Sequence, residues 1–242
     1  MTPAETQPDA AHPPHEYPWV SAVRAVYPQP DRPLPERPDA AARLVVAVGS
    51  NASPAVMAAK LGHAIPIFGV RVAGLAVGHS AHVAARGYIP ATPVPSPGAA
   101  LSTGAAWLGD DDLATLDSTE PNYHRLTVTT HDHPLCPSPD QPPTPDDAPT
   151  EFSVYVSRHG ALGDARTGEV LTFGPQQRVL DWLHARVGDP VFSGDAATVC
   201  ARLGRPATAR TITERLHAHG LALPVWPSHG DAASAVGTGV RR

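Results

Sequence analysis

Apolar residues fall in short runs along the chain, and each run ends at glycine, at proline or at a cluster of polar residues. The continuous apolar run over 43–48 predicts a buried strand. The strand stops at the tight loop 49–51, and Ser53 and Pro54 then provide an N-cap and a first helical position for a short helix over 55–61. The patterned region therefore begins with a strand, a loop and a helix in succession.

The following sequence continues this mixture of strand-like and helical patterns. Strands are predicted at 66–77, 83–92, 100–108, 123–130, 152–157 and 169–173. A hairpin is predicted around 160–168. One helix is predicted to begin at the acidic residues 110–112, because negative charges suit the positive end of a helix dipole. Three further helices are predicted at 176–186, 195–203 and 208–219. Many short strands with a few helices predict a small α+β, barrel-like domain.

Proline, with 29 residues in the chain, marks the segments outside this pattern. Its density over 1–42 predicts a Pro-rich, mostly disordered N-terminal arm, whose apolar island 19–27 is a candidate for packing on the body as a short helix. We predict one domain over 43–222. The Pro-rich stretch 134–149 is a loop inserted in it, because strand-like sequence resumes afterwards. Residues 223–242 predict a flexible C-terminal tail.

Charge and composition exclude several functional classes. The formal net charge is −5, which argues against a nucleic-acid partner, because such proteins usually carry a basic face. No apolar stretch approaches the roughly 18 residues that a membrane span needs, so no membrane partner is expected. The start of the chain does not have the pattern of a secretory signal, and the two cysteines, Cys136 and Cys200, cannot form a disulfide framework. We expect a cytoplasmic protein, and the sequence leaves its oligomeric state open.

Two segments carry candidate chemistry. The loop Gly49-Ser50-Asn51 lies between a strand and a helix, where several backbone N–H groups point to one spot and suit a carboxylate or a phosphate. Glu120 follows a helix that Leu113 and Leu116 anchor, and a carboxylate held at such a junction beside apolar side chains can serve as a general base. Each segment also has a plain structural interpretation: a common turn and a solvated helix-terminal glutamate.

A third segment favours the chemical interpretation of the other two. Residues 86–98 are a strand that leads into a loop stiffened by proline. The three segments, in this order, resemble the gamma-glutamylcyclotransferase-like superfamily. The resemblance covers about residues 43–130, and it rests on Val48-Gly49-Ser50-Asn51, on Gly87-Tyr88-Ile89-Pro90-Ala91-Thr92 with Ser96-Pro97-Gly98, and on Leu116-Asp117-Ser118-Thr119-Glu120 with Tyr123. Val48 stands where the family has a tyrosine.

The resemblance implies a small, partly closed mixed β-barrel with flanking helices. It implies release of 5-oxoproline from a small-molecule γ-glutamyl amine, with Glu120 as the general base and no metal or organic cofactor. The loop Gly49-Ser50-Asn51 would cradle the α-carboxylate of the substrate through its N–H groups. The other substrate-binding residues that the resemblance implies are Val48, Tyr88, Tyr123 and Tyr155. The leaving amine is not identified.

Three alternatives remain open from the residues. The first is a noncatalytic domain of the same fold that binds a small carboxylate. The second is a serine hydrolase, but its nearest nucleophile motif, 78–82, has Ala81-His82 where the sharp turn needs glycine. The third is a metal site at His131, His133 and Cys136, which do not have a second ligand pair at a recognised spacing. We favour the enzyme over the binding domain.

Overall fold

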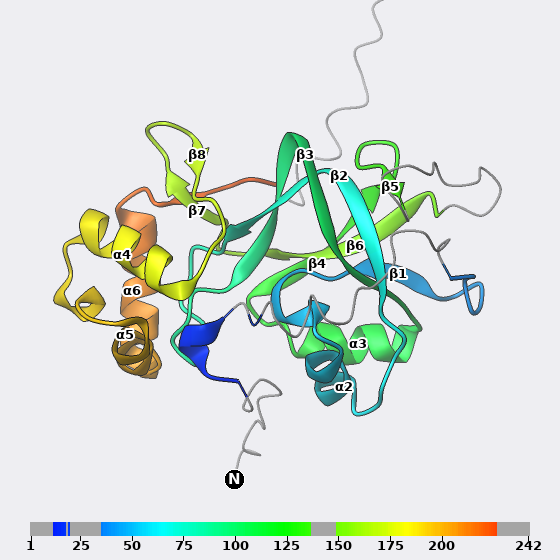
Figure 1. Ribbon diagram of the computed structural model, residues 1–242, viewed down its shortest axis with the longest axis horizontal. Coiled ribbons are helices and arrows are strands. Elements are labelled where there is room, and N and C mark those ends of the chain that lie inside the picture. The colour runs from blue at the N-terminus through cyan, green and yellow to red at the C-terminus, as the bar shows by residue number, and fades with distance from the viewer. Residues whose placement is uncertain (1–11, 18, 20–34, 137–148, 227–242) are drawn as a thin grey trace, which may run out of the picture.

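The structure, a computed structural model, describes residues 12–17, 19, 35–136 and 149–226 (Figure 1). Its architecture is mixed α+β, as the sequence predicts. The described residues form a six-stranded mixed sheet, a second sheet of three short strands, and helices that gather in two groups. Most of the predicted arm, insert and tail lies outside the described residues.

The larger sheet has the strand order β4-β6-β1-β3-β2-β5. Its strands are β1 (Arg43–Val46), β2 (Phe68–His79), β3 (Ala91–Leu108), β4 (Tyr123–Thr129), β5 (Leu135–Cys136) and β6 (Glu151–Ser157). β1 pairs antiparallel with β3 and parallel with β6, so this short strand lies inside the sheet. Leu44, Val45 and Val46 are all buried, which explains why β1 is a continuous apolar run rather than an alternating one.

The predicted strand 83–92 is wrong for most of its length, because 83–90 form a loop and β3 starts at Ala91. The Gly87 N–H donates to the Ala84 carbonyl, and Gly87 has a φ of +89°, which closes a turn that a strand cannot contain. A Cβ at this position would also collide with the Cys200 carbonyl. The apolar side chains of this loop therefore pack on helices, not in a sheet.

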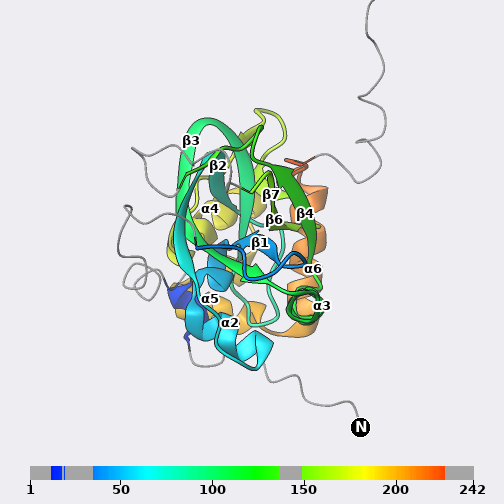
Figure 2. The same ribbon diagram turned by 90° about the vertical axis from the view of Figure 1, so that its right-hand side faces the viewer.

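One group of helices covers the larger sheet beneath β1. It consists of the short η2 (Gly49–Ala52), α2 (Pro54–Leu61) and α3 (Asp110–Ser118), which lie below β1 in both views (Figures 1 and 2). The apolar faces of α2 and α3 share with the sheet a core cluster of seven buried residues, Val45, Met57, Ala106, Leu108, Leu113, Leu116 and Tyr155. This packing fixes the ends of η2 and α3, where the candidate residues lie.

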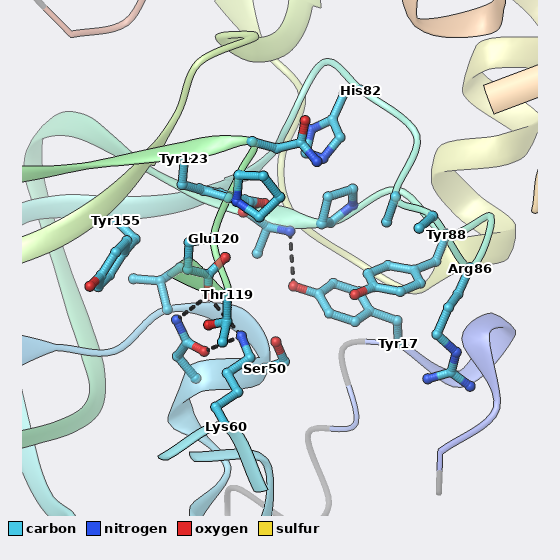
Figure 3. Close-up of a pocket in the computed structure, with 18 residues that line it drawn as sticks. Tyr17, Ser50, Lys60, His82, Arg86, Tyr88, Thr119, Glu120, Tyr123 and Tyr155 are labelled. Carbon is cyan, nitrogen blue, oxygen red and sulfur yellow. Dashed lines mark hydrogen bonds and ion pairs between the residues drawn. The ribbon is translucent and has the colours of Figure 1, made fainter. Parts of the chain in front are cut away.

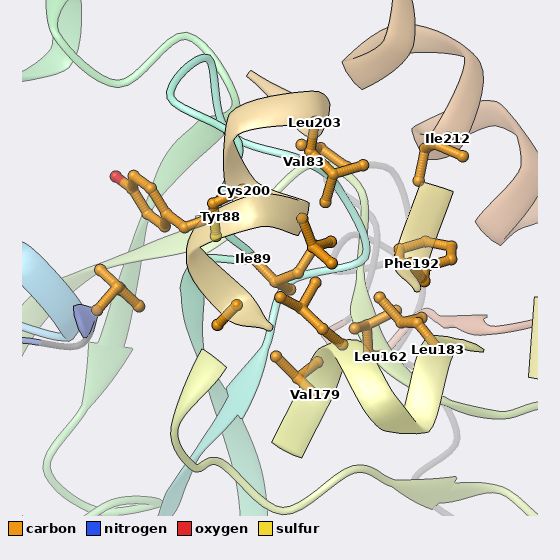
Figure 4. Close-up of a cluster of buried hydrophobic side chains, with 14 of the residues drawn as sticks. Val83, Tyr88, Ile89, Leu162, Val179, Leu183, Phe192, Cys200, Leu203 and Ile212 are labelled. Atoms are coloured by element: carbon orange, nitrogen blue, oxygen red, sulfur yellow. The ribbon is translucent and has the colours of Figure 1, made fainter. Parts of the chain in front are cut away.

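The second group of helices packs around the loop 83–90. It consists of α4 (Gln176–Val187), η3 (Pro190–Phe192), α5 (Ala196–Leu203) and α6 (Pro206–Ala218), beside the small sheet β7 (Ala161–Asp164), β8 (Glu169–Val170) and β9 (Ala222–Leu223). Figure 4 shows the largest hydrophobic cluster, in which Ile89 lies between α4 and α5. The helices predicted at 176–186, 195–203 and 208–219 match α4, α5 and α6 within two residues at each end.

The sheet does not close into a barrel within the described residues. Two isolated bridges, from Gly78 to Thr172 and from Ser80 to Ala161, link the end of β2 to the segment around the small sheet. β4 pairs only with β6 and β5 only with β2, so both are edges of the described sheet. The α+β class is established, whereas barrel closure stays a prediction.

The described part of the N-terminal arm packs on the body. Residues of η1 (Pro14–Glu16) precede Tyr17 and Trp19, which are 2% and 5% exposed. Of the predicted apolar island, Trp19 is buried, and 20–27 lie outside the described residues. At the other end of the domain, the Trp226 indole donates to the Pro93 carbonyl at 2.8 Å. No helix among the described segments is long and apolar enough to cross a membrane.

Candidate functional site

A pocket lies where the loop after β1, the turn after α3 and the segment 82–91 meet (Figure 3). Its volume is about 170 Å³, below the roughly 300–1,000 Å³ of sites for drug-sized ligands, so it suits a small molecule. Seven of the eight residues proposed from the sequence line it: Val48, Ser50, Asn51, Tyr88, Glu120, Tyr123 and Tyr155. The eighth, Gly49, lies in the same loop.

Glu120 lies in the turn after α3 and faces the loop after β1. The turn is held by two backbone bonds, from the Glu120 N–H to the Asp117 carbonyl and from the Tyr123 N–H to the Glu120 carbonyl. The side chain is 11% exposed, and its Oε1 accepts from Asn51 Nδ2 at 2.8 Å and from Lys60 Nζ at 2.7 Å. No described residue donates to Oε2. The structure therefore brings Glu120 and Asn51 together although they are 69 positions apart.

Lys60 is one of the pocket residues that the sequence reasoning missed. It lies in the last turn of α2, is 7% exposed, and donates to Asn51 Oδ1 at 2.8 Å as well as to Glu120. Two signals could have revealed it. Lys60 is the only lysine among 18 basic residues, and it follows Val56 and Met57 by four and three positions, which places it on the buried face of its helix.

The three side chains form a closed hydrogen-bonded group. Lys60 contacts both Asn51 and Glu120, and Asn51 contacts Glu120 (Figure 3). Removing two charges from water costs several kcal/mol per ion, and only good geometry with further hydrogen bonds offsets this cost. The amide of Asn51 supplies those further bonds, because it donates to the carboxylate and accepts from the ammonium.

The loop after β1 carries two backbone N–H groups that no described residue accepts from. Gly49 has a φ of +66°, and a Cβ there would collide with the Tyr17 hydroxyl. The first N–H groups of a helical turn have no acceptor within that turn, and none of the described residues accepts from the N–H of Gly49 or Ser50. These two amides, with the ammonium of Lys60 close by, are suited to an anionic group.

The hydroxyls of Tyr123 and Tyr155 are bound to protein groups. Tyr123 donates to the Ala91 carbonyl at 2.9 Å, and burial raises the pKa of its hydroxyl. Tyr155 donates to Asp117 Oδ1 at 2.7 Å, and burial together with this bond raises its pKa. Burial raises the pKa of Asp117, but the hydrogen bonds from Arg125 and Tyr155 lower it more, so this pKa lies below its ordinary value. Both tyrosines line the pocket as neutral residues.

His82 forms another part of the wall and is neutral near pH 7. Its Nδ1 hydrogen-bonds Ser80 Oγ, and its ring stacks on His159 with centroids 4.6 Å apart. Burial, with the charges of His159 and His217 adding to it, lowers the pKa of His82 to about 3. Ser80 is fully buried and also bonded to Ser157, so no substrate reaches it as a nucleophile.

Of the residues considered for a metal site, the structure describes the side chains of His131 and His133. His133 Nδ1 lies 3.2 Å from the Ala73 carbonyl. Across 12–17, 19, 35–136 and 149–226, no group of three or more histidine, cysteine, aspartate or glutamate side chains is arranged to hold a metal ion. The groups on which a function for the pocket can be argued are the backbone amides, the ion pair and the aromatic side chains.

Comparisons with known proteins give likenesses only among solved structures. No protein-family model and no curated protein matches the chain. A structure named gamma-glutamyl cyclotransferase aligns over 78% of this chain and 90% of its own, at 13% identity and a TM-score of 0.39. An Arabidopsis thaliana protein solved in solution aligns over 62% of this chain and 78% of its own, at 18% identity and a TM-score of 0.39. We therefore infer a function from the pocket itself.

Proposed function

We propose that the protein is a gamma-glutamylcyclotransferase-like enzyme, which cyclises a small γ-glutamyl amine to 5-oxoproline and releases the free amine. The observation that carries the proposal is the position of Glu120. Its carboxylate is largely buried, lines the pocket, and is bonded to Asn51, which lines the same pocket together with Ser50. A glutamate with only a structural role at a helix end would bond its helix neighbours or point into solvent.

In this reaction the substrate supplies its own nucleophile. Glu120 takes a proton from the α-ammonium group, and the freed amine attacks the γ-carbonyl carbon. The new C–N bond closes a five-membered ring, and Glu120 passes its proton to the leaving nitrogen as the bond to that amine breaks. The ring nitrogen gives up a second proton as it becomes the lactam N–H, and the released amine takes up this proton and leaves as an ammonium ion. Ring closure within one molecule depends mainly on orientation and on one positioned base, and the pocket offers both.

The protein groups divide this work. The amides of Gly49 and Ser50 bind the α-carboxylate of the substrate, and the ammonium of Lys60 adds a positive charge beside it. Lys60 and Asn51 both bond Oε1 of Glu120, so they orient the carboxylate and leave Oε2 for proton transfer. The rings of Tyr88, Tyr123 and Tyr155 form apolar wall around the reacting atoms.

A second candidate is a noncatalytic domain that binds a small carboxylate. The observation that favours it is the ion pair. A carboxylate that Lys60 holds at 2.7 Å is able to shape an anion-binding loop without taking part in catalysis. In that case Glu120 supports binding and takes no proton. The two candidates share the ligand and differ in turnover.

The test is release of 5-oxoproline from a panel of γ-glutamyl amines by the purified chain. The panel covers γ-glutamyl amino acids, peptides and polyamines, and calorimetric titration with 5-oxoproline measures binding in parallel. Turnover of any member supports the enzyme. Binding of 5-oxoproline without turnover supports the second candidate, and absence of both contradicts the two together.

A further inference from the structure

We propose that Tyr17, from the N-terminal arm, is a positioning residue of the pocket. Its hydroxyl holds the Ala91 peptide against the Gly49 loop, in the arrangement that binds the carboxylate of the substrate. The inference rests on the proposed function for its ligand, and on the contacts of Tyr17 for its geometry. It makes the arm a part of the site, not an appendage of the domain.

The segment that carries Tyr17 is clamped to the body on several sides. The Tyr17 ring stacks on Tyr88 at 4.5 Å between centroids and meets Trp19 edge-on at 4.9 Å. The Trp19 indole donates back to the Pro13 carbonyl at 2.9 Å, and Arg86 donates to the His12 carbonyl at 2.6 Å. The stack on Tyr88 places the phenol ring at the edge of the pocket (Figure 3).

The Tyr17 hydroxyl contacts two elements of the site at once. It accepts a hydrogen bond from the Ala91 N–H at 2.9 Å, while Tyr123 donates to the carbonyl of the same residue at 2.9 Å. Two tyrosine hydroxyls, one from the arm and one from β4, therefore hold both polar groups of Ala91. On its other side, the Tyr17 oxygen occupies the space that a side chain at Gly49 would need.

This placement connects the arm to the proposed anion-binding amides. Gly49 and Ser50 begin η2, and Ala91 begins β3, so the hydroxyl lies where these two elements meet. The hydroxyl fixes the position of the loop whose amides are proposed to bind the carboxylate of the substrate, so its loss should weaken substrate affinity. A residue with only a structural role would change stability and leave affinity unchanged.

The test compares Tyr17→Phe with Trp19→Phe in the full chain. The first variant removes the hydroxyl and keeps the ring stack on Tyr88. The second removes another hydrogen bond of the arm, the part-buried bond to Pro13, keeps an aromatic ring beside Tyr17, and leaves the bond to Ala91 in place. The measurements are KM and kcat for the best panel substrate, the Kd of 5-oxoproline, the unfolding temperature, and amide hydrogen exchange at Ala91 and in η2.

We expect Tyr17→Phe to raise KM and the Kd of 5-oxoproline about fivefold or more, the size of one net hydrogen bond, with a smaller change in kcat. Trp19→Phe should leave both constants at wild-type values while it lowers the unfolding temperature to a similar extent. Unchanged affinity in Tyr17→Phe, or an equal loss in both variants, would overturn the inference.

Hydrogen exchange separates this inference from the proposed function. If the wild-type chain neither turns over nor binds any panel member, the proposed function fails. Faster exchange at Ala91 and in η2 in Tyr17→Phe, with wild-type rates in Trp19→Phe, would still support Tyr17 as the residue that fixes this junction. Equal exchange rates in the two variants and the wild type would refute it.

Discussion

One oxygen atom of the pocket, Oε1 of Glu120, accepts hydrogen bonds from both Asn51 and Lys60. Lysine is otherwise absent from the chain, in which the remaining 17 basic residues are all arginine. On a surface the two residues exchange easily, whereas a compact ammonium group and a planar guanidinium fork fit different buried sites. The single lysine therefore lies in a buried site, where an arginine would not fit in the same way.

Replacement of Lys60 by Met should lower the free energy of unfolding by about 3 kcal/mol, because it leaves the carboxylate of Glu120 without its partner in a largely buried position. Urea unfolding measures this change. Arg166→Met is the matched control, because its pair with Asp164 involves a side chain that is 88% exposed. An exposed pair contributes about 0–1 kcal/mol, so equal losses in the two variants would contradict a special role for Lys60.

The secondary-structure elements show where sequence reasoning succeeds. β1, α2, α3 and the three C-terminal helices were predicted because their signals are local: an apolar run, a cap, a helical period. The motif residues around Asn51 and Glu120 could also be selected in advance, because their order along the chain carried the resemblance. The contact between Asn51 and Glu120 results from the packing of α2 and α3 beneath β1.

Other features depend on partners far away in the chain, and no local pattern predicts them. The run 83–90 looks like a strand because its apolar residues face a core, but that core is built by helices about a hundred residues later. Lys60 and Tyr17 enter the pocket through contacts with Glu120 and Ala91, at separations of 60 and 74 positions. Only the folded chain reveals such pairs.

The loop after β1 allows a test with a matched pair of glycines. Gly49 and Gly62 both have positive φ, at +66° and +80°, so alanine is strained at either position. Nothing lies within 4 Å of a Cβ at position 62, whereas at 49 it meets the Tyr17 hydroxyl. Gly49→Ala should therefore destabilise the protein by about 1–2 kcal/mol more than Gly62→Ala in thermal unfolding. Equal losses would show that the Tyr17 contact is not tight.

The whole fold also carries a pH dependence, because it buries two neutral histidines. Burial lowers the pKa of His79 to about 4, and that of His82 to about 3. Their unfolded-state value is about 6.5, so below this pH the unfolded chain binds protons that the folded chain does not. Stability should then be constant above about pH 6.5 and fall as the pH drops towards 4.

Each of these histidines contributes up to about 1.4 kcal/mol of lost stability per pH unit in that range. Urea unfolding at pH 7.5, 6.0 and 5.0 measures the slope. His82→Gln removes one titrating group, and it should reduce the slope by about half of the two-histidine contribution. A variant with the wild-type slope would mean that His82 takes up protons equally in the folded and the unfolded chain, and would contradict the lowered pKa.

The proposed cyclisation depends on Glu120 as the proton acceptor. The most direct measurement is the rate of 5-oxoproline release by the wild type, by Glu120→Gln and by Glu151→Gln, whose glutamate is exposed on β6. We expect the first variant to lose at least about a hundredfold in kcat with its folding retained, and the second to match the wild type. Turnover by Glu120→Gln at the wild-type rate would contradict the assigned role, and with it the proposed mechanism.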